Sequence, residues 1–275
     1  KNGLYGFTLP DEAYKSAVTK WMQMSRKTQI KPEWIVTTLG TIYSLATTIR
    51  LVCTDPDDGI IVTTPVYNRY RQAADRLNKK TVECPLLYDS VNGSYQMDFD
   101  AIKSAMANPN NKLFVLCNPH NPVGRVWTKE ELETIGDICY RHHVIVVSDE
   151  IHADFLKKGK EFVSTLKIRT ELKERLIVCN SITKTFNVPG VILSNMIIPD
   201  TRIREKVKET IDRWGLHNPN IFAAGIMEAA YTECDDWLEQ VNIYLEENYN
   251  FLAKYLQKHM PELEVLSLIH ISEPT

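Results

Sequence analysis

Apolar and polar positions follow two different periods along the chain, and these periods predict helices and strands in turn. Within residues 11–24 the apolar side chains recur every three or four positions, as on one face of a helix. Residues 59–63 and 144–148 are short β-branched runs, which are typical of buried strands. Apolar strands separated by amphipathic helices predict a largely parallel sheet that is covered on both faces.

The same criteria assign the remaining elements. Strands are predicted at residues 34–37, 59–63, 80–85, 113–117, 144–148, 176–179 and 193–198. Helices are predicted at residues 11–24, from Gly40 onward, and at 67–77, 98–106, 128–141, 202–213, 222–232 and 237–259. Asn92-Gly93 predicts a tight hairpin turn. The last helix is long enough to link two domains.

We therefore expect one large domain and the beginning of a second. Residues 1–240 are assigned to a three-layer αβα domain, and residues 241–265 to an interdomain helix and the start of a small C-terminal α/β domain. Residues 266–275 match the translation of a widely used sequencing adapter, although their chemistry alone would favour an apolar strand beginning at Glu264. We expect the natural protein to continue past Val265 and to begin before Lys1.

Composition narrows the class of partner. The chain has 275 residues, 44% of them hydrophobic, and a net charge of -3. This balance creates no field that favours nucleic acid or an anionic membrane, and the apolar runs are far shorter than the roughly 20 residues of a spanning helix. Six scattered cysteines without a CxxC motif, and the lack of a signal-like start, suggest reduced thiols in a cytoplasmic protein. A small-molecule partner is expected, with no nucleic acid and no membrane.

Polar side chains follow three of the predicted strands where each strand ends. An Asn-Pro-His-Asn-Pro segment occupies residues 118–122, Asp149 follows Ser148, and a Ser-Ile-Thr-Lys segment occupies residues 181–184. Sheets of this kind bind ligands at the carboxyl ends of their strands. The sequence therefore predicts that an amide, a carboxylate and an amine meet at one edge of the sheet.

Those three groups suit one cofactor. Alone, Lys184 would be a surface lysine and Asp149 a helix cap, but together with Asn121 they supply what pyridoxal 5'-phosphate requires. Lys184 would bind the aldehyde as an imine, Asp149 would keep the ring nitrogen protonated, and Asn121 would bond the phenolic oxygen. Once displaced by the substrate amine, Lys184 would move the α-proton as general base.

The motifs resemble the signature segments of fold-type I pyridoxal-phosphate enzymes of the class I/II aminotransferase family. They are Asn-Pro-His-Asn-Pro-Val-Gly at 118–124, Ser-Asp-Glu-Ile-His at 148–152 and Ser-Ile-Thr-Lys-Thr-Phe-Asn at 181–187. Gly-Arg-Val-Trp at 124–127 and Lys-Thr-Phe-Asn at 184–187 look most like the branch of cystathionine β-lyase and related cysteine-sulfur lyases. The resemblance implies an aspartate-aminotransferase-like fold and a homodimer.

The resemblance also implies roles around the cofactor ring. Tyr67 would stack on the pyridine, Asn121 would bond its phenolic oxygen, and Asp149 would pair with its nitrogen. His152 would lie near the phenolic oxygen, where many relatives have a tyrosine. From the residues alone, Tyr67 could equally be a core aromatic, and His152 a hydrogen-bonded, partly buried histidine.

A second set of residues is implied at the phosphate. Backbone N–H groups of Gly40, Thr41 and Ile42 at a helix start would bind it, because the partial positive charge of a helix N-terminus favours an anion. Ser181 would add a hydroxyl. Gly40 by itself is weak evidence, since any strand-to-helix turn can use glycine.

Some positions depart from the family pattern. Relatives in this branch usually have Gly-Tyr where this chain has Gly6-Phe7, so either Tyr5 substitutes or the phosphate loses a contact. Thr183 replaces the usual serine before the lysine and preserves a hydroxyl. Residues 188–195 contain no arginine, as in the lyase branch, and the arginine for the substrate carboxylate would lie beyond Val265.

We expect β-elimination from cystathionine or a related cysteine thioconjugate, giving a thiol, pyruvate and ammonia. The alternative is a class I/II aminotransferase of amino acids and 2-oxo acids, which would use the same residues. A further alternative is a non-catalytic regulatory relative on the same scaffold, although the Lys184 and Asp149 pair argues against it. As given, the chain would bind the cofactor poorly.

Overall fold

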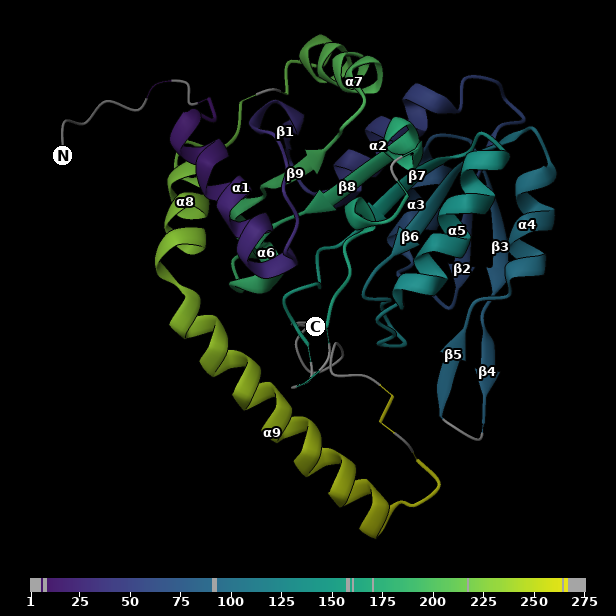
Figure 1. Ribbon diagram of the computed structural model, residues 1–275, viewed down its shortest axis with the longest axis vertical. Helices are drawn as coiled ribbons and strands as arrows, with labels where there is room; N and C mark the ends of the chain where they lie inside the picture. The colour runs from purple at the N-terminus through teal and green to yellow at the C-terminus, as the bar shows by residue number, and fades with distance from the viewer. Residues whose placement is uncertain are drawn as a thin grey trace.

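The computed structural model describes residue 6 and residues 9–90, 93–156, 159, 161–169, 171–216, 218–263 and 265–266 (Figure 1). The strands are β1 (Ile35–Thr38), β2 (Gly59–Thr64), β3 (Lys80–Pro85), β4 (Leu87–Asp89), β5 (Ser94–Gln96), β6 (Asn111–Cys117), β7 (Ile145–Asp149), β8 (Leu176–Asn180) and β9 (Ser194–Ile197). The α-helices are α1 (Glu12–Arg26), α2 (Thr41–Val52), α3 (Arg69–Arg76), α4 (Phe99–Ala107), α5 (Lys129–Arg141), α6 (Ile182–Thr185), α7 (Thr201–Arg213), α8 (Ala223–Glu233) and α9 (Asp235–His259).

One seven-stranded sheet organises the chain, in the order β1-β9-β8-β7-β6-β2-β3. Strands β3, β2, β6, β7 and β8 are parallel to one another. Strand β9 runs antiparallel to both β8 and β1. An antiparallel neighbour requires no helical crossover, and the chain reaches β9 through the short α6 and a 3-10 turn at Pro189–Val191. The predicted, mostly parallel sheet is confirmed.

Side chains of the central strands alternate between two cores. In β6, Phe114 and Leu116 pack with α4 and α5, whereas Leu113, Val115 and Cys117 face α2, α3 and α7. This alternation follows from the two-residue period of a strand. The sheet is therefore the middle of three layers, as predicted (Figure 1).

A third core lies beside the sheet. Helices α1 and α8 pack together there and enclose part of α6. Trp21 of α1 stacks on Tyr231 of α8, with ring centroids 4.7 Å apart, and Phe186 just after α6 contacts both rings. The short helix α6 is thus supported by aromatic packing.

Most predicted elements occur within one or two residues of their predicted limits. The helix predicted at 67–77 begins later, at Arg69, because Tyr67 is not helical and Asn68 is the N-cap residue. Asn92 of the predicted hairpin turn lies outside the described residues, while β4 and β5 on either side pair antiparallel. The expected boundary between residues 240 and 241 falls inside the continuous helix α9.

No helix in the described part of the chain combines the length and the apolarity that crossing a bilayer demands. Five of the six cysteines are buried, and Cys234 is half-buried. The thiols are therefore packed as small apolar groups.

The N-terminus of α5 carries a capping box that offers a first test. Thr128 Oγ1 accepts from the Glu131 backbone N–H at 3.2 Å, and the Glu131 carboxylate accepts from the Thr128 N–H at 2.7 Å. We expect Thr128→Ala to lower the free energy of unfolding by about 1 kcal/mol, because the cap is lost. Urea titration measures this change. Thr128→Ser should restore the stability, and an alanine variant as stable as the parent would contradict the role of the cap.

Candidate active site

Three neighbouring parallel strands end at the same level of the sheet. Cys117 of β6 pairs with Asp149 of β7, which pairs with Cys179 of β8. Backbone bonds continue beyond the strands, from Asn118 N–H to the Asp149 carbonyl at 3.0 Å and from Glu150 N–H to the Cys179 carbonyl at 2.9 Å. The segments that carry the predicted amide, carboxylate and amine therefore leave the sheet at one edge.

Asp149 is a buried carboxylate surrounded by donors, and 5% of its surface is exposed. The Tyr70 hydroxyl donates to Oδ2 at 2.9 Å, and the Ile151 N–H donates to Oδ1 at 3.3 Å. Burial raises the pKa of Asp149, while the Tyr70 hydroxyl, His152 and the other donors, including Thr41, act to lower it. The cost of burying this carboxyl group is thus only partly offset by its donors, as is common for carboxyl groups in functional sites.

Tyr70 was not anticipated from the sequence. It is buried, and its pKa is raised well above the usual value by burial first and then by the neighbouring Asp149 charge. Its ring meets that of Tyr67 edge-on, at 5.7 Å between centroids and 88° between planes. Tyr67 precedes α3 and Tyr70 lies in its first turn, and their three-residue spacing was the available signal.

Tyr67 and Asn121 are brought together by their backbones. The Tyr67 N–H donates to the Asn121 carbonyl at 3.1 Å, although the two residues are distant in sequence. Asn121 is buried and Tyr67 is half-buried, so part of the Tyr67 surface is accessible. His152 is buried in the turn that follows β7. Tyr67, Tyr70, Asn121, Asp149 and His152 therefore form one neighbourhood.

Lys184 lies half-buried on the four-residue helix α6, which the sequence patterns did not predict. Ser181 caps this helix by accepting from the Thr183 N–H at 3.0 Å. The Ser181 hydroxyl also donates to the Leu193 carbonyl at 2.5 Å. In this arrangement Ser181 orients the turn that carries Lys184, and its predicted hydroxyl bond to a phosphate stays a prediction.

The loop before α2 contains the predicted anion-binding amides. Gly40 has a φ of 117°, which only glycine adopts easily, and it is the N-cap residue of α2. Its N–H donates to Ser194 Oγ at 3.1 Å in this structure, and its phosphate contact stays a prediction. Thr41 and Ile42 belong to the first turn, where N–H groups have no intrahelical acceptor.

This set of groups fits a phosphorylated pyridine. A buried carboxylate, an amine, a buried amide, a half-exposed aromatic ring and a helix N-terminus are the groups such a ligand needs. Within the described residues, no group of three or more His, Cys, Asp or Glu side chains could hold a metal ion. Tyr5 and Phe7, on which one predicted phosphate contact depends, lie outside the described residues.

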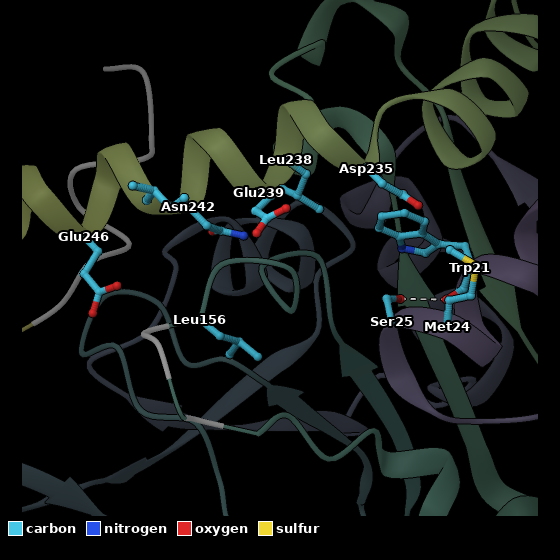
Figure 2. Close-up of a pocket in the computed structure, with 10 residues that line it drawn as sticks. Trp21, Met24, Ser25, Leu156, Asp235, Leu238, Glu239, Asn242 and Glu246 are labelled. Carbon is cyan, nitrogen blue, oxygen red and sulfur yellow. Dashed lines mark hydrogen bonds between the residues drawn. The ribbon is translucent and has the colours of Figure 1, made fainter.

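A separate pocket of about 530 Å³ lies between α1, α9 and the segment after β7 (Figure 2). Its lining includes Trp21, Ser25, Leu156 and Asn242, and none of the predicted cofactor-binding residues. The pocket is therefore distinct from the candidate active site.

Comparison with known proteins adds independent evidence. The chain matches the family described as aminotransferase class I and II over residues 2–272. It is 34% identical to cystathionine beta-lyase PatB of Bacillus subtilis, over 96% of this chain and 68% of that protein. The family match extends into residues 266–275, whose origin stays a prediction.

Solved structures agree with this match. Cystalysin from Treponema denticola, which contains pyridoxal 5'-phosphate, superimposes with a TM-score of 0.92 and 33% identity, covering 96% of this chain and 66% of that one. A C-S lyase from Staphylococcus hominis, bound to the same cofactor, gives a TM-score of 0.86 and 31% identity, covering 94% and 66%. This chain thus spans about two thirds of the length of these relatives.

The pKa of Asp149 yields a pH-dependent test without cofactor. The pKa of Asp149 in the folded protein is raised above the ordinary value of 3.8. As the pH rises past 3.8, the unfolded chain therefore loses this proton more readily than the folded one, and the free energy of unfolding falls. The loss of stability is complete once the pH exceeds the pKa of the folded protein. We expect Asp149→Asn to be more stable than the parent at pH 7, by about 1.4 kcal/mol for each unit by which the pKa is raised.

The gain should vanish as the pH falls below about 3.8, where the parent carboxyl is protonated in both states. Urea titrations across this pH range measure the difference. The matched control is Asp75→Asn, the same substitution at an exposed position on α3 outside the candidate site. A loss of stability in Asp149→Asn that is equal at all pH values would contradict the burial cost.

Proposed function

Because this chain belongs to the aminotransferase class I and II family, we propose that the protein is a pyridoxal-phosphate-dependent carbon-sulfur β-lyase. The predicted family is confirmed. Cystathionine or a related cysteine thioconjugate would react with water to give a thiol, pyruvate and ammonia. The observation that carries this proposal is the 34% identity to a cystathionine beta-lyase over nearly the whole chain. The two carbon-sulfur lyases that share its fold at 31% and 33% identity support it further.

The proposed cofactor residues are those of the buried strand ends. When bound, pyridoxal 5'-phosphate supplies an electron sink for negative charge at the substrate α-carbon. Asp149 would pair with the ring nitrogen, and the Tyr70 hydroxyl on its Oδ2 would keep that carboxylate oriented. Tyr67 would cover one face of the ring, and Asn121 would donate to the phenolic oxygen, with His152 nearby. Gly40, Thr41 and Ile42 would supply N–H groups to the phosphate, and Ser181 would add a hydroxyl.

Lys184 has two proposed tasks. Its amine would hold the cofactor covalently before substrate binds, and afterwards its Nζ would accept the proton from the substrate α-carbon. Both tasks require the amine to lie at the same edge as Asp149, which the register of β7 and β8 supports. Departure of the β-thiol then completes the elimination, and water releases pyruvate and ammonia.

A transaminase is the second candidate, because the family includes aminotransferases and the same residues serve both reactions. A non-catalytic regulatory protein is the third, and the presence of both Lys184 and Asp149 argues against it.

We further propose a homodimer. Exposed apolar side chains, such as that of Phe222 at the N-terminus of α8, support it. The cytoplasm is the proposed location, supported by the buried thiols.

Product analysis separates the two enzymatic candidates. The full-length protein, loaded with pyridoxal 5'-phosphate, should release thiol and pyruvate from cystathionine in equal amounts without any added 2-oxo acid. A thiol reagent and a coupled pyruvate assay measure the two products. Strict dependence on an added 2-oxo acid, with a new amino acid as product, would establish the transaminase instead.

Lys184→Ala tests the covalent link. We expect this variant to lose the visible absorbance of lysine-bound cofactor and to lose activity by at least about 10³-fold, because both the covalent link and the general base are removed. Lys167→Ala, an exposed lysine on a 3-10 turn, is the control and should keep both properties. Unchanged absorbance in Lys184→Ala would refute the assignment.

A further inference from the structure

Asp154, in the turn after β7, joins three helices that are far apart in sequence. Its Oδ1 accepts from the Arg26 guanidinium of α1 at 2.5 Å, and its Oδ2 accepts from the Thr185 hydroxyl of α6 at 2.6 Å. Its backbone carbonyl accepts from the Asn242 amide of α9 at 3.0 Å. A single aspartate therefore fixes α6 relative to both α1 and α9.

The Arg26 and Asp154 pair is almost completely buried, with 3% and 4% of the side chains exposed. The guanidinium also lies over the ring of Phe162, at 5.3 Å from its centroid. Burial acts to lower the pKa of Arg26, but the charges of Asp154 and Glu150 outweigh it, so the pKa is raised and the cation persists. Neither charge can leave its partner without remaining buried and uncompensated, so the geometry of the pair is fixed.

Helix α6 depends on such outside contacts. It has four residues, and a helix this short has little intrinsic stability. Its N-terminal end is attached through Ser181 to the Leu193 carbonyl, and its C-terminal end through Thr185 to Asp154. Lys184 lies between these two attachments. Successive helical residues point about 100° apart, so fixing Thr185 also fixes the direction in which the Lys184 side chain leaves the backbone.

We propose that Asp154, held by Arg26, is a positioning residue for Lys184 and acts through the Thr185 hydroxyl. This inference rests on the proposed cofactor-binding role of Lys184, but not on whether the reaction is elimination or transamination. Asp154 also lies two residues after His152, so the same anchor connects the Lys184 helix to the turn that contains His152. Asn242 extends the connection to the wall of the pocket between α1 and α9 (Figure 2).

Hydroxyl deletion at Thr185 tests the proposal in the cofactor-loaded, full-length enzyme. Thr185→Val keeps the β-branched shape but cannot donate to Asp154. We expect the pH midpoint of the visible absorbance of lysine-bound cofactor to shift by at least about half a unit. We also expect kcat to fall by about 10-fold or more with KM changed less than about two-fold, because misplacement of a reacting group acts on the chemical step.

Matched variants separate positioning from stability. Thr185→Ser restores the donor and should return both the absorbance midpoint and kcat to near the parent values. Thr48→Val removes another buried hydroxyl, which donates to the Ser44 carbonyl within α2, and should leave both readouts unchanged. Thr185→Ala makes the same deletion with a smaller side chain, and it replaces the valine variant if that one does not fold.

The proposal is overturned if Thr185→Val or Thr185→Ala lowers only the urea midpoint while the absorbance titration and kcat stay at parent values. It is equally overturned if Thr185→Ser behaves like valine. Failure of the proposed lyase reaction is a different result, seen in the parent enzyme as 2-oxo acid dependence. The absorbance titration reports on Lys184 in either reaction class.

Discussion

The burial of one carboxyl group at the end of β7, that of Asp149, is the constraint around which the site is built. A carboxylate removed from water is costly unless donors replace its hydration. Here Tyr70 from α3, the backbone of Ile151 and Thr41 from α2 supply them, and burial still raises the pKa of Asp149. Helices α2 and α3 on one face of the sheet and the turn after β7 are therefore arranged about the carboxyl group of Asp149. Carboxyl groups with such a residual burial cost are common at functional sites, where a ligand of opposite charge can offset it.

The scaffold was predictable because its elements are long and periodic. Buried strands such as β7 and capped helices such as α5 carry their signals within a few neighbouring residues. The position of Asp149, directly after an apolar strand, was likewise visible in the chain itself. The direction of β9 was not, because an apolar strand has the same pattern whichever way it runs. Helix α6 was missed because its four residues make little more than one helical turn, so no periodic pattern repeats within it.

Contacts between distant segments explain the remaining differences. The role of Tyr70 depends on a carboxylate 79 positions away, and that of Gly40 on Ser194, 154 positions away. Nothing near Gly40 in the sequence indicates that its amide is already bonded. The Arg26 and Asp154 pair is separated by 128 positions, and an isolated arginine in an amphipathic helix is normally taken for a solvent-exposed residue. The roles of these residues can be recognised only after folding has brought their distant segments together.

Helix α9 extends away from the sheet as one continuous rod (Figure 1). Asn242 attaches it near its beginning, and the 17 residues from there to His259 span roughly 26 Å at about 1.5 Å per residue. Any tilt about that attachment is amplified along the rod, so that about 5° at Asn242 would displace the far end by roughly 2 Å. In such a tilt the helix would act as a lever that pivots where Asn242 bonds to Asp154 and Leu245 packs against Phe155. Conversely, a displacement of the distal end of α9 would become a much smaller displacement at Asn242, and so at Asp154 and at the helix α6 that contains Lys184.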